Sequence, residues 1–209
     1  MAPRVVDREQ RKKEIAGIAL DLYAEKGFEG TSISGIARLA GIGKGTIYEY
    51  FDSKEQLMIS ALTAWVEKLS RKAEGELEGL DDPVERLKKI VRGIMEGFIS
   101  DPRKLKLIVT MFHMLITDKT FYARHNMVRE VLQGMQKTIV EILQDGVSAG
   151  CFRPEAAWDA EKIAMNLLAY LDGIALHHYM SESYFSLESL VDFYLQQLLQ
   201  SLKPCEADS

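Results

Sequence analysis

The chain has 209 residues, of which 47% are hydrophobic, and it carries a net charge of −5 at pH 7. This length suggests one extended domain, or a small module joined to a larger one, with enough apolar side chains for a sizeable core. No stretch approaches the roughly 20 apolar residues that a membrane span needs, and the charged N-terminus does not have the pattern of a secretory signal. We therefore predict a cytoplasmic protein without a membrane partner.

The charge is distributed unevenly along the chain. Residues 1–54 contain nine Lys and Arg against eight Asp and Glu, whereas residues 55–209 contain seventeen against twenty-three. Phosphate repels an acidic surface, so a nucleic-acid-binding segment, if the chain has one, belongs to the N-terminal quarter.

Apolar residues recur at helical spacing throughout, and no convincing period-two run is present, so the sequence predicts an all-α protein. A first helix is predicted over residues 7–26, and Gly27 ends it. A second helix begins after Thr31 or Ser32, which are both good N-caps. The turn 41–43 leads to a short third helix over residues 44–50.

The later helices have clear start signals. Ser53 and Gln56 form a capping box for a fourth helix, and a boundary is predicted near residues 74–80, where two glycines interrupt a polar stretch. Asp-Pro pairs at 82–83 and 101–102 predict two further helix starts. The remaining helices are predicted over residues 118–147, from Pro154 to Met180 and, with Ser186 as its cap, over 187–202. A disordered tail is predicted at 204–209.

The second and third helices form a pattern with a specific meaning. Two helices joined by a tight turn that contains glycine are typical of a helix-turn-helix, whose second helix meets base edges at its N-terminal end. That end is Lys44, Gly45 and Thr46. Gly45 lets the backbone approach DNA closely, Lys44 can reach a base edge or a phosphate, and Thr46 can touch a thymine methyl group or a phosphate.

Further polar side chains are predicted to contact phosphates and so to set the register of the unit on DNA. These residues are Ser32, Ser34, Tyr48, Tyr50 and Lys54. The basic residues of the first 13 positions have two interpretations, a phosphate-seeking arm or a solvated helix face. They are Arg4, Arg8, Arg11, Lys12 and Lys13.

At these residues the sequence resembles the TetR family of bacterial transcriptional regulators. The matching motif covers residues 30–57, and its most specific parts are Ala40-Gly41-Ile42, Lys44-Gly45-Thr46, Ile47-Tyr48-Glu49-Tyr50-Phe51 and Ser53-Lys54-Glu55-Gln56-Leu57. The first helix matches too, through Tyr23-Ala24-Glu25-Lys26-Gly27-Phe28. Over residues 80–209 the resemblance rests on helix order and on the short segments 146–153 and 171–173.

The resemblance implies a helix-turn-helix DNA-binding domain over residues 1–53 and a larger helical ligand-binding and dimerisation domain over 54–203. It implies a repressor that binds a palindromic double-stranded operator as a homodimer and is released by a small apolar or amphipathic molecule. The helix from Lys54 to Leu77 would be the lever between ligand and DNA. The alternative is a DNA-binding regulator or structural factor that has no small-molecule ligand and is controlled by a protein partner.

The resemblance also implies that the last two helices pair with their copies as a four-helix bundle. On pattern alone, the same residues could be ordinary core. The candidate interface residues are Ile163, Leu167, Leu171, Ile174, His178, Leu190, Tyr194 and Leu198.

A ligand pocket is expected among the middle helices, because Met and aromatic side chains adapt to varied apolar molecules. A Met-filled core is the alternative. The candidate pocket residues are Met111, Phe112, His113, Met114, Phe121, Tyr122, Asn166, Tyr170 and His177.

No catalytic, metal or cofactor site is predicted. The sequence contains neither HExxH nor Gly-x-Ser-x-Gly, and its glycine-rich turn at 41–45 follows a helix instead of the strand that a phosphate-binding loop needs. Cys151 and Cys205 have no His or Cys at ligand spacing, and they fit a reducing compartment as two free thiols, with a disulfide between them as the alternative.

Overall fold

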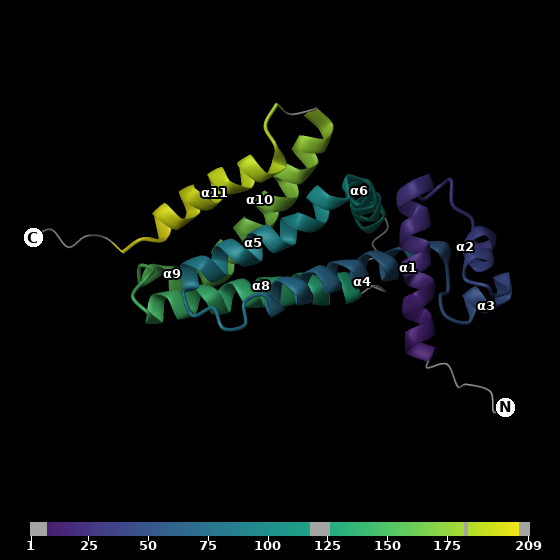
Figure 1. Ribbon diagram of the computed structural model, residues 1–209, viewed down its shortest axis with the longest axis horizontal. Helices are drawn as coiled ribbons and strands as arrows, with labels where there is room; N and C mark the ends of the chain where they lie inside the picture. The colour runs from purple at the N-terminus through teal and green to yellow at the C-terminus, as the bar shows by residue number, and fades with distance from the viewer. Residues whose placement is uncertain (1–7, 118–125, 182–183, 205–209) are drawn as a thin grey trace, which may run out of the picture. The chain divides into compact units, whose positions relative to one another are not determined.

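The computed structural model describes residues 8–117, 126–181 and 184–204, and all regular structure within these ranges is helical, as the sequence predicted. Figure 1 shows the helices in chain order from purple to yellow. They are α1 (Arg8–Lys26), α2 (Ile33–Leu39), α3 (Lys44–Tyr48), α4 (Lys54–Gly75), α5 (Pro83–Ser100), α6 (Pro102–Thr117), α8 (Asn126–Ser148), α9 (Glu155–Trp158), α10 (Ala160–Ser181) and α11 (Leu187–Leu202).

Packing divides the chain into two compact units, and the division runs through α4 and α8. The first unit contains Met1–Lys68 and Arg103–Glu130, and the second contains Leu69–Pro102 and Val131–Ser209. Because α4 is one continuous helix, it starts in the first unit and ends in the second. The domain boundary between residues 53 and 54, which follows the motif, stays a prediction.

The first unit is built around the apolar faces of α1, α2, α3 and the start of α4, and α2 packs against both α1 and α3 (Figure 1). Its fully buried side chains include those at Ile15, Tyr23, Ile36, Ile47 and Phe51. The predicted choice between two caps for α2 is resolved in favour of Ser32, whose hydroxyl oxygen accepts the Gly35 N–H.

Thr31, the other predicted cap, has a different task. Its side chain is buried, and its hydroxyl lies 3.2 Å from the carbonyl oxygen of Leu22 and 2.8 Å from that of Gly27. These contacts fasten the loop before α2 to the end of α1, where Gly27 adopts a φ of 74°. Thr31 therefore holds the entry of the helix-turn-helix in place.

In the second unit, α5 packs against α11, and α10 packs against α11. Two of the predicted start signals hold in this unit, since Asp82 caps α5 with Pro83 in its first turn, and Ser186 caps α11. The loop after α8 contacts the end of α11, because the Arg153 N–H donates to the Leu202 carbonyl at 2.8 Å.

One predicted helix is wrong in its extent. The helix expected from Pro154 to Met180 is interrupted at Asp159, which separates the four-residue α9 from α10. Asp is poor in a helix interior but favourable at a helix start, and the Asp159 carbonyl accepts the Ile163 N–H while its carboxylate pairs with Lys162 at 2.7 Å. Of the helix predicted over 118–147, residues 118–125 lie outside the described ranges.

Candidate nucleic-acid interface

The N-terminal end of α3 is presented to solvent from a rigid base. Lys44 and Gly45 are exposed and Thr46 is half-buried, whereas Ile47, one residue further on, is completely buried. Gly41, in the turn before α3, has a φ of 66°, a left-handed conformation that glycine adopts without strain. One short helix thus has an exposed N-terminal end and, three residues after Lys44, a buried anchor at Ile47.

The other predicted DNA contacts occupy different environments. Ser34 is exposed and so is Tyr48, at 48% of its surface, whereas Tyr50 is half-buried. The Ser32 oxygen is used as the α2 cap, which leaves its hydroxyl proton available to a phosphate. The Lys54 ammonium lies 4.2 Å from the centre of the Phe28 ring, which holds this cation at the start of α4.

The α1 arginines make contacts that neither sequence interpretation contained. The Arg8 guanidinium donates to the Glu49 carbonyl oxygen at 2.8 Å, and that of Arg11 donates to the Ala40 carbonyl oxygen at 2.9 Å. These partners lie 41 and 29 residues away in the chain, so no local pattern could indicate them. Lys13 is exposed, and Arg4 lies outside the described residues.

A buried tyrosine joins α1 to the start of α4. The Tyr23 hydroxyl donates to the Lys54 carbonyl oxygen at 3.1 Å, and burial, followed by the nearby charge of Glu55, raises the pKa of Tyr23 well above its usual value. The hydroxyl therefore stays protonated and remains a donor. Together, these contacts fix the exposed end of α3 relative to the surrounding helices of the first unit.

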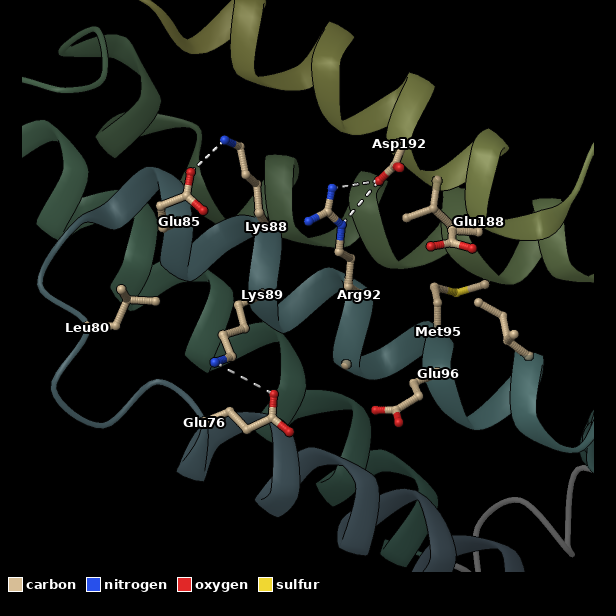
Figure 2. Close-up of a pocket in the computed structure, with 13 residues that line it drawn as sticks. Glu76, Leu80, Glu85, Lys88, Lys89, Arg92, Met95, Glu96, Glu188 and Asp192 are labelled. Carbon is tan, nitrogen blue, oxygen red and sulfur yellow. Dashed lines mark hydrogen bonds and ion pairs between the residues drawn. The ribbon is translucent and has the colours of Figure 1, made fainter.

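The second unit contains a cavity of about 630 Å³ bounded by α5, α11 and the segment between α4 and α5 (Figure 2). Apolar groups at Leu80, Met95, Ile99 and Val191 lie beside charged ones. The charged lining residues are Glu76, Glu85, Lys88, Lys89, Arg92, Glu96, Glu188 and Asp192. This size and mixed lining suit a ligand with both an apolar and a polar part.

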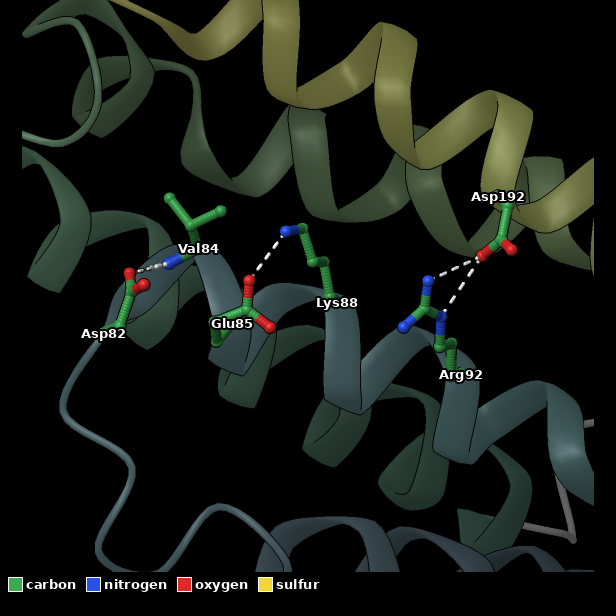
Figure 3. Close-up of polar contacts among 6 residues, drawn as sticks. All are labelled: Asp82, Val84, Glu85, Lys88, Arg92 and Asp192. Atoms are coloured by element: carbon green, nitrogen blue, oxygen red, sulfur yellow. Dashed lines mark hydrogen bonds and ion pairs between the residues drawn. The ribbon is translucent and has the colours of Figure 1, made fainter.

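Ion pairs surround this cavity and link its walls. Arg92 of α5 reaches Asp192 of α11 through Nε and Nη2 at 3.1 and 2.9 Å (Figure 3). Lys88 pairs within α5 with Glu85 at 2.6 Å, next to the Asp82 cap on the Val84 N–H. All the paired side chains are substantially exposed, so water and salt weaken these attractions.

Family models match both parts of the chain. Residues 17–61 match the model described as bacterial regulatory proteins of the tetR family, and residues 83–200 match the C-terminal model of BetI-type transcriptional repressors. The chain belongs to the TetR family of bacterial transcriptional regulators. The resemblance predicted from the helix-turn-helix motif is confirmed, and the first match spans α2 and α3.

Known proteins resemble this TetR-family regulator over most of its length. The transcriptional repressor KstR2 of Rhodococcus jostii is 26% identical over 92% of this chain and 91% of its own. The FadR regulator of Bacillus subtilis, solved with stearoyl-CoA, is 22% identical and has a TM-score of 0.74; the match covers 90% of this chain and 98% of FadR. A regulator from Saccharomonospora viridis, solved with choline, is 21% identical and has a TM-score of 0.75; the match covers 93% of this chain and 97% of that regulator. The two structures share its fold.

The predicted ligand residues fall in both units of this regulator. On α6, Met111 is buried, Phe112 and Met114 are half-buried, and His113 is exposed. Phe121 and Tyr122 lie outside the described residues. Asn166, Tyr170 and His177 lie on α10, where Asn166 and His177 are exposed. The cavity of Figure 2 has none of these residues in its lining, and it is lined by charged side chains that sequence analysis did not select.

The predicted dimer residues need a correction. Leu167 and Leu171 are buried within the protomer itself, at 0% and 2% exposure, so they are core and cannot meet a partner. Their spacing on α10 did indicate an apolar stripe, but it is the stripe that faces the protomer's own core. Ile163, Ile174, His178, Leu190, Tyr194 and Leu198 are half-buried.

Residues predicted for the pocket and for the dimer face lie together in a smaller groove of about 370 Å³ between α10 and α11. Its lining is Tyr170, Gly173, Ile174, His177, His178, Ser181 and Leu190. The Tyr170 ring stacks on that of Tyr194 at 3.7 Å, and Nδ1 of His178 is buried with no hydrogen-bond partner among the described residues. The two predicted sets therefore cannot be assigned to separate sites on α10.

The remaining predictions concern metal sites, membrane-spanning helices and the two cysteines. Within residues 8–117, 126–181 and 184–204, no group of three His, Cys, Asp or Glu side chains could hold a metal ion, and no helix is long and apolar enough to cross a membrane. Cys151 is a free thiol, and Cys205 lies outside these ranges.

Proposed function

We propose that this regulator binds a palindromic operator as a homodimer, with the N-terminal end of α3 in the major groove. The observation that carries the proposal is the start of α3, where Lys44 and Gly45 are exposed and Thr46 is half-buried, directly before the buried anchor Ile47. A short helix with small and polar groups at its exposed start suits base edges. Ser34 and Tyr48 flank it with hydroxyls for phosphates.

The test begins with selection of bound duplexes from a random-sequence DNA library by the purified protein. An enriched inverted repeat supports the proposal, and no enrichment contradicts it. Against the enriched duplex, Lys44→Ala and Tyr48→Ala should each weaken binding by about tenfold, because a base or phosphate contact is lost. Lys13→Ala removes a similar charge from α1 and is the control. Equal affinities of all variants in a gel-shift titration would exclude the assigned contacts.

Dimerisation is proposed through exposed apolar side chains of α10 and α11. Met165, Tyr179, Met180 and Phe193 expose 68%, 47%, 65% and 61% of their surfaces. A soluble protein seldom leaves so many large apolar groups in water unless another surface covers them. Phe193→Asp should lower the dimer fraction in light scattering and weaken operator binding, because two linked reading units bind better than one. An unchanged dimer would exclude this face.

We further propose that an amphipathic molecule releases the operator by binding the cavity of Figure 2. The cavity is lined by Glu76, which directly follows α4, and α4 has residues in both units, so we propose that a ligand there acts through this helix. A ligand shifts the equilibrium only as far as it binds the released state more tightly. The ligands of the two solved relatives, stearoyl-CoA and choline, are suitable probes because one is large with a long apolar chain and the other is small and cationic.

The ligand proposal is tested by melting the protein with stearoyl-CoA or choline chloride, since a bound ligand raises the melting temperature. Ile99, which lines the cavity and is 46% exposed, allows a blocking variant, Ile99→Trp. We expect a shift with one probe that Ile99→Trp abolishes, and loss of operator binding at the same concentration. A shift that survives Ile99→Trp would place the ligand elsewhere, and no shift with a range of amphipathic compounds would favour control by a protein partner.

A further inference from the structure

Both helices of the helix-turn-helix end on a carbonyl group that an arginine of α1 binds. Ala40 is the C-cap of α2, and Glu49 is the C-cap of α3. Arg11 donates to the Ala40 carbonyl at 2.9 Å, and Arg8 donates to the Glu49 carbonyl at 2.8 Å. One turn of α1 thus serves two helix ends that are nine positions apart in the sequence.

The short helix α3 needs stabilising contacts from outside the helix. This helix has only five residues, which is too short for its own hydrogen bonds to keep it folded. The last carbonyl groups of any helix lack backbone donors, and they form the negative end of its dipole. A guanidinium at Glu49 supplies both the missing donor and a compensating positive charge, and Ile47 and Phe51 supply the apolar anchor.

The two arginines are suited to act together. Positions 8 and 11 are three residues apart on one helix and therefore lie on the same face. The Arg8 guanidinium also lies 5.8 Å from the centre of the Tyr50 ring, while Arg11 is held by Glu14 at 2.8 Å. Each arginine is oriented by a second contact, so each fixes a backbone position in the unit that carries the reading helix.

We propose that Arg8 and Arg11 are positioning residues for DNA recognition, which set the orientation of α3 and α2 without contacting DNA themselves. This inference rests on the proposed role of α3 in the major groove. It separates two kinds of α1 cation that look alike in the sequence. Arg8 and Arg11 hold the reading helices, and the exposed Lys13, two residues beyond Arg11, has no such contact with the described residues.

The experiment compares Arg8→Ala, Arg8→Lys and Arg11→Ala with the matched control Lys13→Ala in the full-length protein. Each is titrated with the duplex enriched by the wild-type protein and with a scrambled duplex of the same composition, at several salt concentrations. We expect Arg8→Ala and Arg11→Ala to lose about three- to tenfold in affinity for the enriched duplex only. Binding to the scrambled duplex and the salt slope should match those of Lys13→Ala.

The conservative variant adds a specific readout. Lysine keeps the charge and a donor for the Glu49 carbonyl but has no planar group for the Tyr50 ring, so Arg8→Lys should recover part of the loss. Hydrogen exchange gives a readout that does not depend on DNA. The Phe51 amide, bonded to the Ile47 carbonyl at the end of α3, should exchange faster in Arg8→Ala than in Lys13→Ala.

The outcomes separate this inference from the function on which it rests. Equal losses on both duplexes, with a salt slope lower by about 0.9 for each contact removed, would identify Arg8 as a phosphate contact and overturn the proposal. Wild-type affinity with unchanged exchange at Phe51 would overturn it too. If the wild-type protein enriches no duplex, the proposed operator function fails, while faster Phe51 exchange in Arg8→Ala alone would still support the positioning of α3.

Discussion

The two compact units connect their helices by different kinds of polar contact. In the first unit, side chains reach backbone carbonyl groups, as Arg8 does at Glu49 and Tyr23 at Lys54. In the second unit, most contacts between helices join two charged side chains at the surface, such as Arg92 with Asp192. Arg153 and Gln136 are exceptions, since the Arg153 guanidinium donates to the Ser201 carbonyl at 2.9 Å and the Gln136 amide donates to the Glu161 carbonyl at 3.3 Å.

This difference matches what each unit has to do. A bond to a backbone carbonyl fixes where a helix lies, and a DNA reader needs its short helix in one position to meet a pattern of bases. An exposed ion pair contributes little to stability and exchanges partners at little cost. Under the proposed function, a unit held by apolar packing and exposed ion pairs would admit a ligand between α5 and α11 while its core stays intact.

The largest effect is expected in the apolar core of the second unit. Gly146 of α8 lies against the buried ring of Phe152, and any side chain at this position would overlap that ring. Gly146→Ala should lower the free energy of unfolding by about 1–3 kcal/mol because the core is overpacked. Gly134→Ala, in open space on the same helix, should instead raise it by about 0.5–1 kcal/mol. Urea denaturation measures both, and similar values would contradict this packing.

A direct test of the comparison sets a carbonyl contact of the first unit against an ion pair of the second. Thr31→Val preserves shape but removes the hydroxyl that contacts one buried and one part-buried carbonyl oxygen, which should cost about 1–3 kcal/mol of unfolding free energy. Arg92→Ala and Asp192→Ala should each cost less than about 1 kcal/mol, because both side chains are largely exposed. If the ion pair proved the stronger, the contrast between the units would be wrong.

The smallest effect concerns a charge in the predicted dimer helix. Desolvation raises the pKa of Asp172 from 3.8 to about 6, although the residue as a whole is exposed. The folded chain then holds this proton more tightly than the unfolded chain, so its stabilising contribution is complete below about pH 4 and is lost as the pH rises through about 6. Asp172→Asn should melt higher than the wild type at pH 7.5, and the difference should shrink at pH 5. A difference independent of pH would exclude this titration.

Much of the DNA-reading unit could be predicted from the sequence because its signals are local. The caps, the turn glycine and the spacing of apolar residues all act within about two helical turns, and the family motif covers the same segment. The end of the last helix at Leu202 and its cap Ser186 were predicted for the same reason. The interruption at Asp159 was missed because a single Asp within an apolar pattern does not indicate whether its neighbours continue the helix.

The sequence by itself determined the family, the all-α class and the short exposed segment at Lys44. Only the tertiary structure decided which apolar stripes were core, since periodicity shows that Leu167 and Leu171 share a face but not what covers that face. It also decided what Arg8 and Arg11 bind, because a guanidinium carries the same charge whether it meets a phosphate or a distant carbonyl. Local interactions can be predicted from residues that are neighbours in the sequence, whereas the partner of a long side chain depends on how the helices pack.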